Sequence, residues 1–478
     1  MDADTLLAAL LHRLPYTPND QQSAVAAALT RFVCAPVDPS GNVFVLNGYA
    51  GTGKTTLTGA LVGALESSGT KAVLMAPTGR AAKVFSANSA GRRAWTIHRR
   101  IYRHAPGGIP GSGEYAPGAQ APNREQGAVF IVDEASMIGT ADERGASLLH
   151  DLLQYVFDGR ECRLILMGDT AQLPPVGAEK SPAMNISFLR SLGLKVSGAT
   201  LTATARQAAD SGILFNATRL RRAMAAAIAA ADSPAAVPKL RVTGFPDVRS
   251  VSGEDLPELL EKSYADSLTD TIVITRSNRR ATEYNRAIRS AVLWREEEIT
   301  RDDMLIVARN HYFSRHDKGM PDFVANGDIV AVERVYGTET RYGMRFADVC
   351  LRLPEGNTFD IKILLDNLSS EEANLSREAW LNLYSGILSD NDRFGDTPQT
   401  ERAASLATDP YWNALHVKYA YAITCHKAQG GQWNDVFVDL AYIPEDALGL
   451  PLYRWLYTAI TRARTHLYLI SPPEQLLE

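Results

Sequence analysis

The stretch VFVLNGYAGTGKTTL, residues 43–57, decides the fold of this chain. An apolar run leads into a glycine-rich loop, GYAGTGKT at Gly48 to Thr55, and then into a helical segment that ends near Gly69. Glycines let such a loop curl, so that its N–H groups and the start of the next helix face phosphate oxygens. The stretch therefore predicts a buried strand, a phosphate-binding loop and a helix.

The loop residues suit a nucleoside triphosphate with its metal ion. The Lys54 amine would reach the β and γ phosphates, and the Thr55 hydroxyl would ligate Mg²⁺. We expect the nucleotide contacts of the loop to come from Gly48, Ala50, Gly51, Thr52, Gly53, Lys54, Thr55 and Thr56.

Three further apolar runs in the first 200 residues end in loops that carry Gly, Pro or Asp: AVLMAP at 72–77, VFIVDE at 129–134 and LILMGD at 164–169. Helical stretches separate them. This alternation predicts an α/β fold with a doubly wound parallel sheet, in which ligands bind at the carboxyl ends of the strands.

Those strand ends carry residues that hydrolysis requires. Asp133 would hold the magnesium, and Glu134 would polarise the water that attacks the γ phosphate. A kinase-type phosphate loop has no need for that second acid. Gln172, in GDTAQLPPVG, is placed to sense the γ phosphate.

Phosphoryl transfer also needs positive charge on the transition state, often from an arginine of another domain. Arg206 in LTATARQ and Arg462 in YTAITRARTH are the two candidates. An isolated arginine is more often a surface residue, so their value depends on the surrounding motifs.

Length and composition favour a multidomain enzyme. The chain has 478 residues, of which 45% are hydrophobic and 22% charged, and no stretch approaches a membrane span. The N-terminus carries two acids before its apolar run, which argues against a secretory signal. The four cysteines form no CxxC pair and no zinc-ligand cluster. We expect a cytoplasmic protein with reduced thiols and no membrane contact.

Charge is segregated along the chain, although the formal net charge is −5. Residues 67–113 carry eight Lys or Arg and no acid, and residues 275–289 carry five arginines against one glutamate. Acids outnumber bases over residues 366–401. This pattern is expected if one face follows a phosphate backbone, and the alternative is a set of solvated helix faces.

A second α/β unit begins near Thr200, with strands expected at 270–278, 433–440 and 466–471. Between about 295 and 414 the pattern changes to short alternating strands, such as FVANGDIVAVERVYG, MRFADVCLRL and FDIKILL, which predict a small inserted β-barrel. The Gly- and Pro-rich stretch 104–128 predicts a small surface insertion in the first unit.

The ordered motifs resemble those of superfamily 1 helicases, most closely the branch with the RecD-like, Dda-like and Pif-type enzymes (superfamily 1B). They run from residue 21 to 464: Gln21 in TPNDQQSAV, the phosphate loop, APTGRAAK (76–83), TIH (96–98), DEAS (133–136), GDTAQLPPVG (168–177), Arg206 with Gln207, YAITCHKAQGGQW (421–433) and YTAITRAR (457–464). The chain lacks the long N-terminal region of full RecD-like proteins and shows no clear Pif-type signature between DEAS and GDTAQ.

The resemblance implies two RecA-like domains with ATP between them. The first would span 1–198, with a wedge-like insertion at 104–128 tipped by Tyr102 or Tyr115. The second would comprise 199–294 and 415–478, separated by an SH3-like accessory domain at 295–414.

The resemblance also assigns residues. Gln21 would contact the adenine, Arg206 and Arg462 would reach the γ phosphate, and Gln172 would couple hydrolysis to movement. DNA contacts would come from Thr78, Gly79, Thr96, His98, Ser277, Asn278, Thr424, His426 and Lys427. His98 and His426 could instead be satisfied core histidines.

We expect an ATP- and Mg²⁺-dependent DNA helicase that moves along single-stranded DNA, 5′-to-3′ as the resemblance implies, and unwinds duplexes with a single-stranded tail. A monomer is expected, and no protein partner is indicated. One alternative is a translocase or remodeller that does not separate strands. Another is a nucleotide-dependent switch or scaffold whose slow hydrolysis ignores DNA. RNA or hybrid substrates also remain open.

Overall fold

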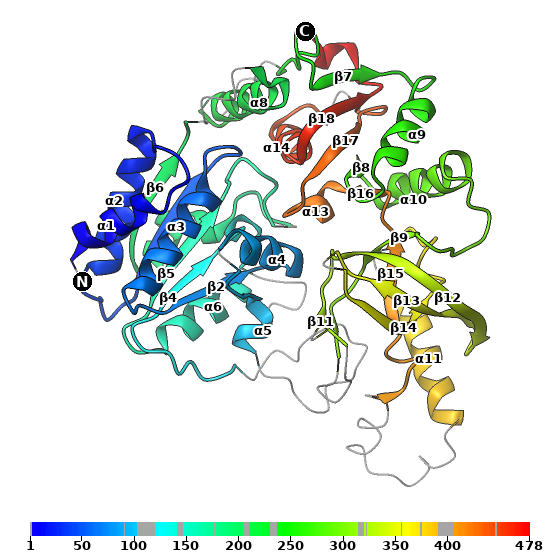
Figure 1. Ribbon diagram of the computed structural model, residues 1–478, viewed down its shortest axis with the longest axis horizontal. Helices are drawn as coiled ribbons and strands as arrows, with labels where there is room; N and C mark the ends of the chain where they lie inside the picture. The colour runs from blue at the N-terminus through cyan, green and yellow to red at the C-terminus, as the bar shows by residue number, and fades with distance from the viewer. Residues whose placement is uncertain are drawn as a thin grey trace.

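The computed structural model describes residues 2–89, 91–102, 120–140, 147–175, 177–203, 210–229, 237–313, 320–321, 323–354, 356–372, 375–390, 406, 408–444 and 447–478. Two α/β units lie side by side, and a β-barrel lies below the second of them and beside the first (Figure 1). None of the helices in these ranges is both long and apolar enough to cross a membrane.

The first unit is built on six parallel strands in the order β3-β2-β4-β5-β1-β6. The strands are β1 (Asn42–Gly48), β2 (Ala72–Ala76), β3 (Ala94–Thr96), β4 (Val129–Val132), β5 (Arg163–Gly168) and β6 (Lys195–Leu201). The four strands expected from the apolar runs are confirmed. The sequence does not predict β3 and β6, which are the two edge strands.

Helices cover both faces of this sheet because successive side chains of its buried strands point to opposite sides. Val43 and Val45 pack with α5 (Ile97–Ile101), α6 (Leu148–Phe157) and α7 (Ile186–Ser191). Phe44 and Leu46 pack on the other face, with α1 (Ala3–His12), α2 (Asp20–Cys34), α3 (Lys54–Ser67) and α4 (Gly79–Asn88).

The second unit has five parallel strands in the order β16-β8-β17-β18-β7. They are β7 (Val248–Val251), β8 (Thr271–Thr275), β16 (Ala422–Thr424), β17 (Trp433–Asp439) and β18 (Ala463–Ile470). The helices of this unit are α8 (Gly212–Ala229), α9 (Leu256–Asp266), α10 (Asn278–Ala287), α13 (Cys425–Ala428) and α14 (Leu450–Ile460). The expected boundary between the two α/β units at residue 198 is wrong, because this residue lies inside β6 of the first sheet.

A closed barrel is inserted in the second unit, with strand order β12-β13-β14-β15-β9. Its strands are β9 (Met304–Val307), β12 (Ile329–Arg341), β13 (Met344–Arg352), β14 (Thr358–Leu364) and β15 (Leu415–Tyr419). A short hairpin, β10 (His311–Tyr312) with β11 (Phe323–Val324), projects from it, and α11 (Arg377–Asp390) packs at its outer end. The expected end of the insert at residue 414 is wrong, because β15, which closes the barrel, extends to Tyr419.

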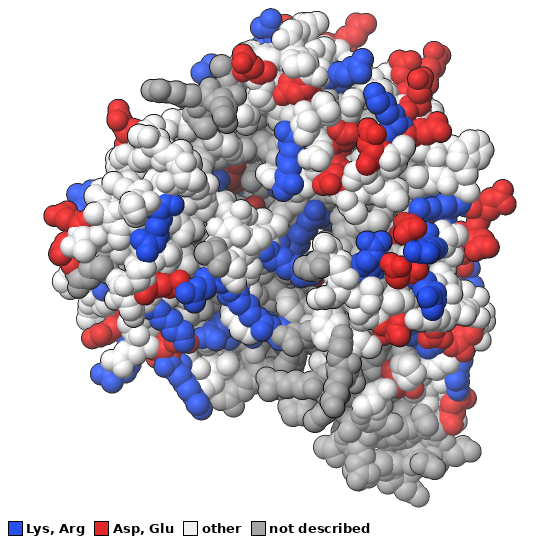
Figure 2. Space-filling model, viewed as in Figure 1, with Lys and Arg blue, Asp and Glu red and all other residues white. Residues whose placement is uncertain are grey.

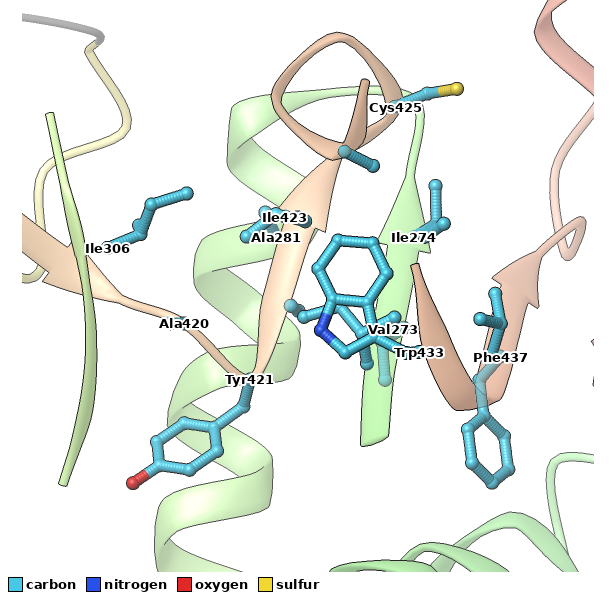
Figure 3. Close-up of a cluster of buried hydrophobic side chains, with 14 of the residues drawn as sticks. Val273, Ile274, Ala281, Ile306, Ala420, Tyr421, Ile423, Cys425, Trp433 and Phe437 are labelled. Carbon is cyan, nitrogen blue, oxygen red and sulfur yellow. The ribbon is translucent and has the colours of Figure 1, made fainter. Parts of the chain in front are cut away.

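The barrel and the second sheet share one hydrophobic core. Leu305 and Val417 of the barrel belong to the same buried cluster as Ile274 and Val438 of the sheet. Figure 3 shows the junction, where the chain leaves the barrel through Ala420 and Tyr421 and enters β16. The insert is therefore continuous with the second unit rather than loosely attached to it.

A buried carboxylate fixes this junction. Asp303, fully buried, accepts hydrogen bonds from Arg289 (2.9 and 3.0 Å), Arg295 (2.7 Å) and the Tyr421 hydroxyl (2.8 Å). Burial alone would raise the pKa of Asp303, but Arg289 and the other donors hold it below its ordinary value. A single carboxylate thus holds both arginines where the barrel begins.

The barrel also contacts the first unit. A Cβ added to Gly79 would lie 1.8 Å from the Cβ of Ala325, so the two backbones approach closely. Lys83 of α4 pairs with Asp328 at 2.9 Å, and the guanidinium carbon of Arg99 lies 4.7 Å from the Phe323 ring centroid. The barrel therefore touches both α/β units.

The wedge-like insertion falls largely outside the described residues, which leave out 103–119 and with them Tyr115. Tyr102 is described. Its hydroxyl donates to Asp151 of α6, and its backbone bridges to Gln120. The suggestion that Tyr102 forms a projecting tip is therefore wrong, because this side chain is tied to the body of the first unit.

Candidate nucleotide cleft and nucleic-acid interface

The phosphate loop lies between β1 and α3. Gly51 (φ 73°) and Gly53 (φ 85°) adopt left-handed backbone conformations that other residues rarely tolerate, and Gly53 precedes the first turn of α3. Lys54 begins that helix, and its amine donates to the carbonyls of Gly48 and Tyr49. The loop has the curled form that turns N–H groups toward a phosphate, and the lysine folds over it.

Two neighbouring glutamines on α2 have different surroundings. Gln21, expected at the adenine, accepts N–H bonds from Thr202 (2.9 Å) and Ala203 (2.8 Å) at the link between the two units. Gln22 donates to the carbonyl of Thr52 in the phosphate loop at 3.1 Å. The sequence does not predict this role for Gln22, although its position in an Asn19 capping box was a local signal for its orientation.

The acidic pair lies at the end of β4. Glu134 has φ 52°, an uncommon conformation for a residue other than glycine, and its N–H donates to the Asp133 carboxylate at 2.8 Å. Burial raises the pKa of Glu134 to about 7, and the charge of Asp133 adds to this rise.

The positive charges of Arg462 and Lys54 oppose this rise in the pKa of Glu134. The charge of Lys54 likewise opposes the raised pKa of Asp133. Lys54 thus acts electrostatically on both carboxyls, and Arg462 acts on that of Glu134. The Thr55 hydroxyl and the Asp133 carboxylate are hard oxygen donors of the kind that Mg²⁺ prefers, so these residues fit the expected metal.

Gln172 is buried in the turn after β5. Its N–H donates to the carbonyl of Asp169 at 3.1 Å, and its Oε1 has no hydrogen-bond partner within the ranges that the structure describes. A buried amide oxygen without a partner is costly, which is consistent with a group that awaits a ligand or a movement.

Arg462 comes from the second unit, two residues beyond α14. It is 4% exposed and donates to the carbonyls of Thr458 (3.0 Å) and Gly431 (3.2 Å). The hydrogen bonds of Arg462 stay within the second unit, while its positive charge lowers the pKa of Glu134 across the boundary, in the first unit. Arg206, the other arginine candidate, lies outside the described residues.

A third arginine, Arg80, spans the same boundary. Its guanidinium carbon lies 4.3 Å from the ring centroid of Trp433, and its Nη1 has no hydrogen-bond partner among the residues with described positions. Burial lowers the pKa of Arg80 to about 10, while Asp328 acts in the opposite direction. The sequence places Arg80 in the APTGRAAK motif but does not predict its partner.

Four of the residues expected to contact DNA occupy equivalent positions. Thr78, Thr96, Ser277 and Thr424 each precede a helix that follows a parallel strand, and the first three accept an N–H bond from the first turn of that helix. The carboxyl ends of parallel strands share one edge of a sheet. Thr78 and Thr96 therefore lie along that edge of the first sheet, and Ser277 and Thr424 lie along that edge of the second.

The remaining expected DNA contacts differ in accessibility. His426 is exposed and Lys427 and Asn278 are half-buried, whereas Gly79 is buried against Ala325. The alternative that His426 is a core histidine is therefore wrong. His98 is half-buried, with its ring 5.7 Å from that of Tyr102.

A small pocket with a cavity volume of about 20 Å³ lies where the second sheet meets the barrel. Asn278, Thr424 and Lys427 line it together with Lys418 of β15. Lys418 donates to the carbonyl of Ser370 at 2.8 Å, and burial lowers its pKa to about 8. Lys418 is a positive residue at this site that the motifs do not identify.

Lys and Arg gather along a hollow across the middle of the face shown in Figure 2, and acidic side chains lie mainly around it. Several basic residues of the two segments are nevertheless paired with acids: Arg100 with Glu125 (2.6 Å), Arg280 with Asp439 (2.9 Å) and Arg289 with Asp303 (2.9 Å). The expectation from sequence charge alone therefore overcounts the cations that could follow a phosphate backbone.

Comparison with known families gives two matches. The AAA domain model matches residues 19–241, and the UvrD-like helicase C-terminal domain model matches residues 419–470. The curated ATP-dependent RecD2 DNA helicase of Deinococcus radiodurans is 39% identical over 137 residues, which make up 28% of this chain. The match covers only 16% of that protein's length.

Solved structures of Pif1 helicases align along nearly the whole chain. Pif1 from Bacteroides, in complex with ADP-AlF3 and ssDNA, is 15% identical at a TM-score of 0.47, covering 97% of this chain and 95% of its own. Pif1 from Candida albicans is 16% identical at a TM-score of 0.40, covering 97% of both chains. Scores below 0.5 do not establish a shared fold, so the fold assignment rests on the two sheets and the barrel.

The order of the two matches agrees with the order of the motifs. The matched AAA domain contains the phosphate loop, Asp133 and Gln172, and the matched helicase domain contains Thr424 and Arg462. The chain is therefore similar to an AAA domain in its N-terminal part and to the C-terminal domain of UvrD-like helicases near its end.

Proposed function

We propose that this protein is an ATP-dependent DNA helicase that moves along single-stranded DNA, in the 5′-to-3′ direction, and unwinds duplexes with a single-stranded tail. One observation carries the proposal. Tyr457 of the second α/β unit is hydrogen-bonded to Ala50 in the phosphate loop and to Asp169 of the first unit, so both units meet at the proposed nucleotide site. A site of this kind couples hydrolysis to relative movement of the units.

The residues around the cleft support ATP hydrolysis. Lys54 and the loop N–H groups would bind the phosphates, Glu134 would accept a proton from the attacking water, and Arg462 would stabilise the developing negative charge. Gln21 of α2, whose side chain is bonded to Thr202 and Ala203, would contact the adenine. A bound Mg²⁺, held by Thr55 and Asp133, would neutralise phosphate charge.

The same two units carry the proposed DNA contacts. Thr78, Gly79, Thr96 and His98 lie on the first, and Ser277, Asn278, Thr424, His426 and Lys427 lie on the second. A strand bound to both sets would be moved when the cleft closes on ATP and reopens after hydrolysis. Because hydroxyls, amides and lysines at these positions suit backbone phosphates, little sequence preference is expected.

The proposal is tested with duplexes that carry a 5′ tail, a 3′ tail or a fork, together with ATPase assays in the presence and absence of single-stranded DNA. We expect DNA-stimulated hydrolysis and unwinding that requires a 5′ tail, both lost in Lys54→Ala. Stimulated hydrolysis without unwinding of any substrate would favour a translocase that does not separate strands. Hydrolysis indifferent to DNA would favour a nucleotide-dependent switch.

The remaining parts of the proposal concern setting and assembly. We propose that the protein acts in the cytoplasm as a monomer, on DNA in preference to RNA. Replacing the tailed DNA with the matching RNA and following sedimentation during turnover would test the last two points. RNA unwinding at an equal rate, or an active dimer, would contradict them.

A further inference from the structure

Tyr457 places one hydroxyl group between the two α/β units. The residue lies within α14 of the second unit and is 1% exposed. Its hydroxyl donates to the Asp169 carboxylate at 2.7 Å and accepts the N–H of Ala50 at 3.0 Å. Both partners belong to the first unit, so the hydroxyl joins the units through two hydrogen bonds.

Each partner of Tyr457 lies in a segment that handles the nucleotide. Ala50 is in the phosphate loop. Asp169 organises the turn that carries Gln172: its carboxylate accepts the N–H of Ala171 at 3.0 Å, and its carbonyl accepts the N–H of Gln172 at 3.1 Å. The Tyr457 hydroxyl therefore connects the phosphate loop, the Gln172 turn and the helix that precedes Arg462.

The Gln172 turn is also held from its other end by the second unit. Leu173 donates its N–H to the Thr458 hydroxyl at 2.9 Å, and its carbonyl accepts from the Gln429 amide at 3.0 Å. Gln429 follows α13 directly, and α13 carries His426 and Lys427. Bonds at both ends make the turn a continuous physical link between α14 and the proposed DNA contacts.

We propose that Tyr457 is a positioning residue for ATP hydrolysis, whose hydroxyl aligns the Gln172 turn and the phosphate loop with α14 and so with Arg462. The inference rests on the proposed function. Tyr457 does not contact the reacting atoms in this role and acts through Asp169. Removing the hydroxyl should therefore impair the catalytic step and its stimulation by DNA more than the binding of nucleotide.

The test compares Tyr457→Phe with Tyr453→Phe, which removes the hydroxyl of another buried tyrosine from the same helix. The Tyr453 hydroxyl makes no hydrogen bond within the part of the chain that the structure describes, so this variant controls for loss of a polar atom in α14. For Tyr457→Phe we expect kcat to fall about tenfold or more, with KM for ATP changed less than about threefold. Stimulation by single-stranded DNA should fall in parallel, and Tyr453→Phe should behave as the wild type.

A double-mutant cycle with Asp169→Asn separates positioning from general destabilisation. If Tyr457 acts through Asp169, the double variant should be no slower than the slower single variant, because both changes break one link. The inference would be overturned if the two substitutions lowered kcat by factors that multiply in the double variant. It would also be overturned if Tyr457→Phe left kcat unchanged, or if it changed KM for ATP more than kcat. Wild-type protein without DNA-stimulated hydrolysis would instead refute the proposed function, so the two failures are distinguishable.

Discussion

The guanidinium carbon of Arg80 lies 4.3 Å from the centroid of the Trp433 ring, which joins α4 of the first unit to β17 of the second. A Cβ on Gly431 would lie 2.5 Å from the same carbon, so the guanidinium is confined on both sides. The stack can persist only while the two units keep their present relative positions. It is therefore a contact that movement of the cleft must alter.

Replacing Arg80 with Gln should weaken the coupling between the units. A partly desolvated cation–π contact is worth about 1–2 kcal/mol, so we expect DNA-stimulated hydrolysis to fall about 5- to 30-fold. Nucleotide affinity without DNA should stay within about threefold of the wild type. Arg93→Gln is the matched control, because Arg93 stacks on Trp95 of its own unit at 4.0 Å. Equal effects of both changes would refute a role in coupling.

Hydrolysis should depend on pH through Glu134. Because the pKa of this carboxyl is raised to about 7, it is protonated below that pH and cannot accept a proton from water. We expect kcat/KM for ATP to fall about tenfold for each pH unit well below 7. Nucleotide binding by Glu134→Gln, measured over the same range, controls for titration elsewhere. A rate that stays constant down to pH 5 would contradict this assignment.

Removing the Arg462 side chain should cost catalysis more than nucleotide affinity. In Arg462→Ala we expect kcat to fall by about 10³-fold, since loss of an arginine at a phosphoryl transition state costs several kcal/mol. Fluorescent nucleotide binding should change less than about tenfold. Arg464→Ala is the control, because Arg464 lies two residues away and, among the residues that the structure describes, its side chain is hydrogen-bonded only to Gln432. Equal losses of affinity and rate would argue against this role.

The close approach of Gly79 to the barrel predicts a size-dependent substitution. Gly79→Ala would place a methyl group 1.8 Å from Ala325, which must force the barrel away from α4. We expect a loss of about 1–3 kcal/mol in the free energy of unfolding. Ala325→Gly in the same chain should restore most of that loss, because it removes the opposing methyl group. Failure of this rescue, measured by urea denaturation, would mean that the contact is not maintained in solution.

The buried carboxylate at the barrel junction predicts a contrast between neighbours. Asp303→Asn should destabilise the protein by about 3 kcal/mol, because it leaves the buried Arg289 and the half-buried Arg295 without a counter-ion. Asp302→Asn should change stability by less than about 1 kcal/mol, because Asp302 is 49% exposed and its nearest arginine nitrogen is 3.7 Å away.

The pH dependence of stability provides a further check on Asp303. Its pKa is held below the ordinary value of 3.8, so its contribution is present above about pH 4 and is lost as the pH falls further. The wild type should therefore lose stability on acidification more steeply than Asp303→Asn. Parallel curves for the two proteins would contradict the ion-pair account.

Local patterns in the sequence predicted the parts of the fold that depend on local chemistry. The strand before the phosphate loop and the strands before Asp133 and Asp169 are buried on both faces, so each appears as a continuous apolar run. The edge strands β3 and β6 have no such run, because β3 is short and β6 alternates exposed residues with small ones. The sequence therefore leaves the borders of the sheets, and with them the domain boundary at 198, poorly determined.

Contacts between the units could not be derived in this way. Tyr457 and Arg80 both lie in recognised motifs, but their partners are hundreds of residues away in the sequence. Conversely, the arginine-rich segment at 275–289 overstated the DNA surface, because Arg289 neutralises a buried acid. Charge counted along a chain does not distinguish a solvated cation from one that is paired in the interior.

The end of the barrel has a mechanical consequence. β15 closes the barrel, and only Ala420 and Tyr421 separate it from β16, which leads directly to Thr424. A force on the barrel would thus be transmitted through this two-residue connection to the segment proposed to hold DNA. Excision of residues 295–414 would cut this connection within the barrel and leave β15 unpaired. The insert is therefore a mechanically continuous part of the second unit, and in the proposed motor any force on the barrel would reach Thr424 through the backbone.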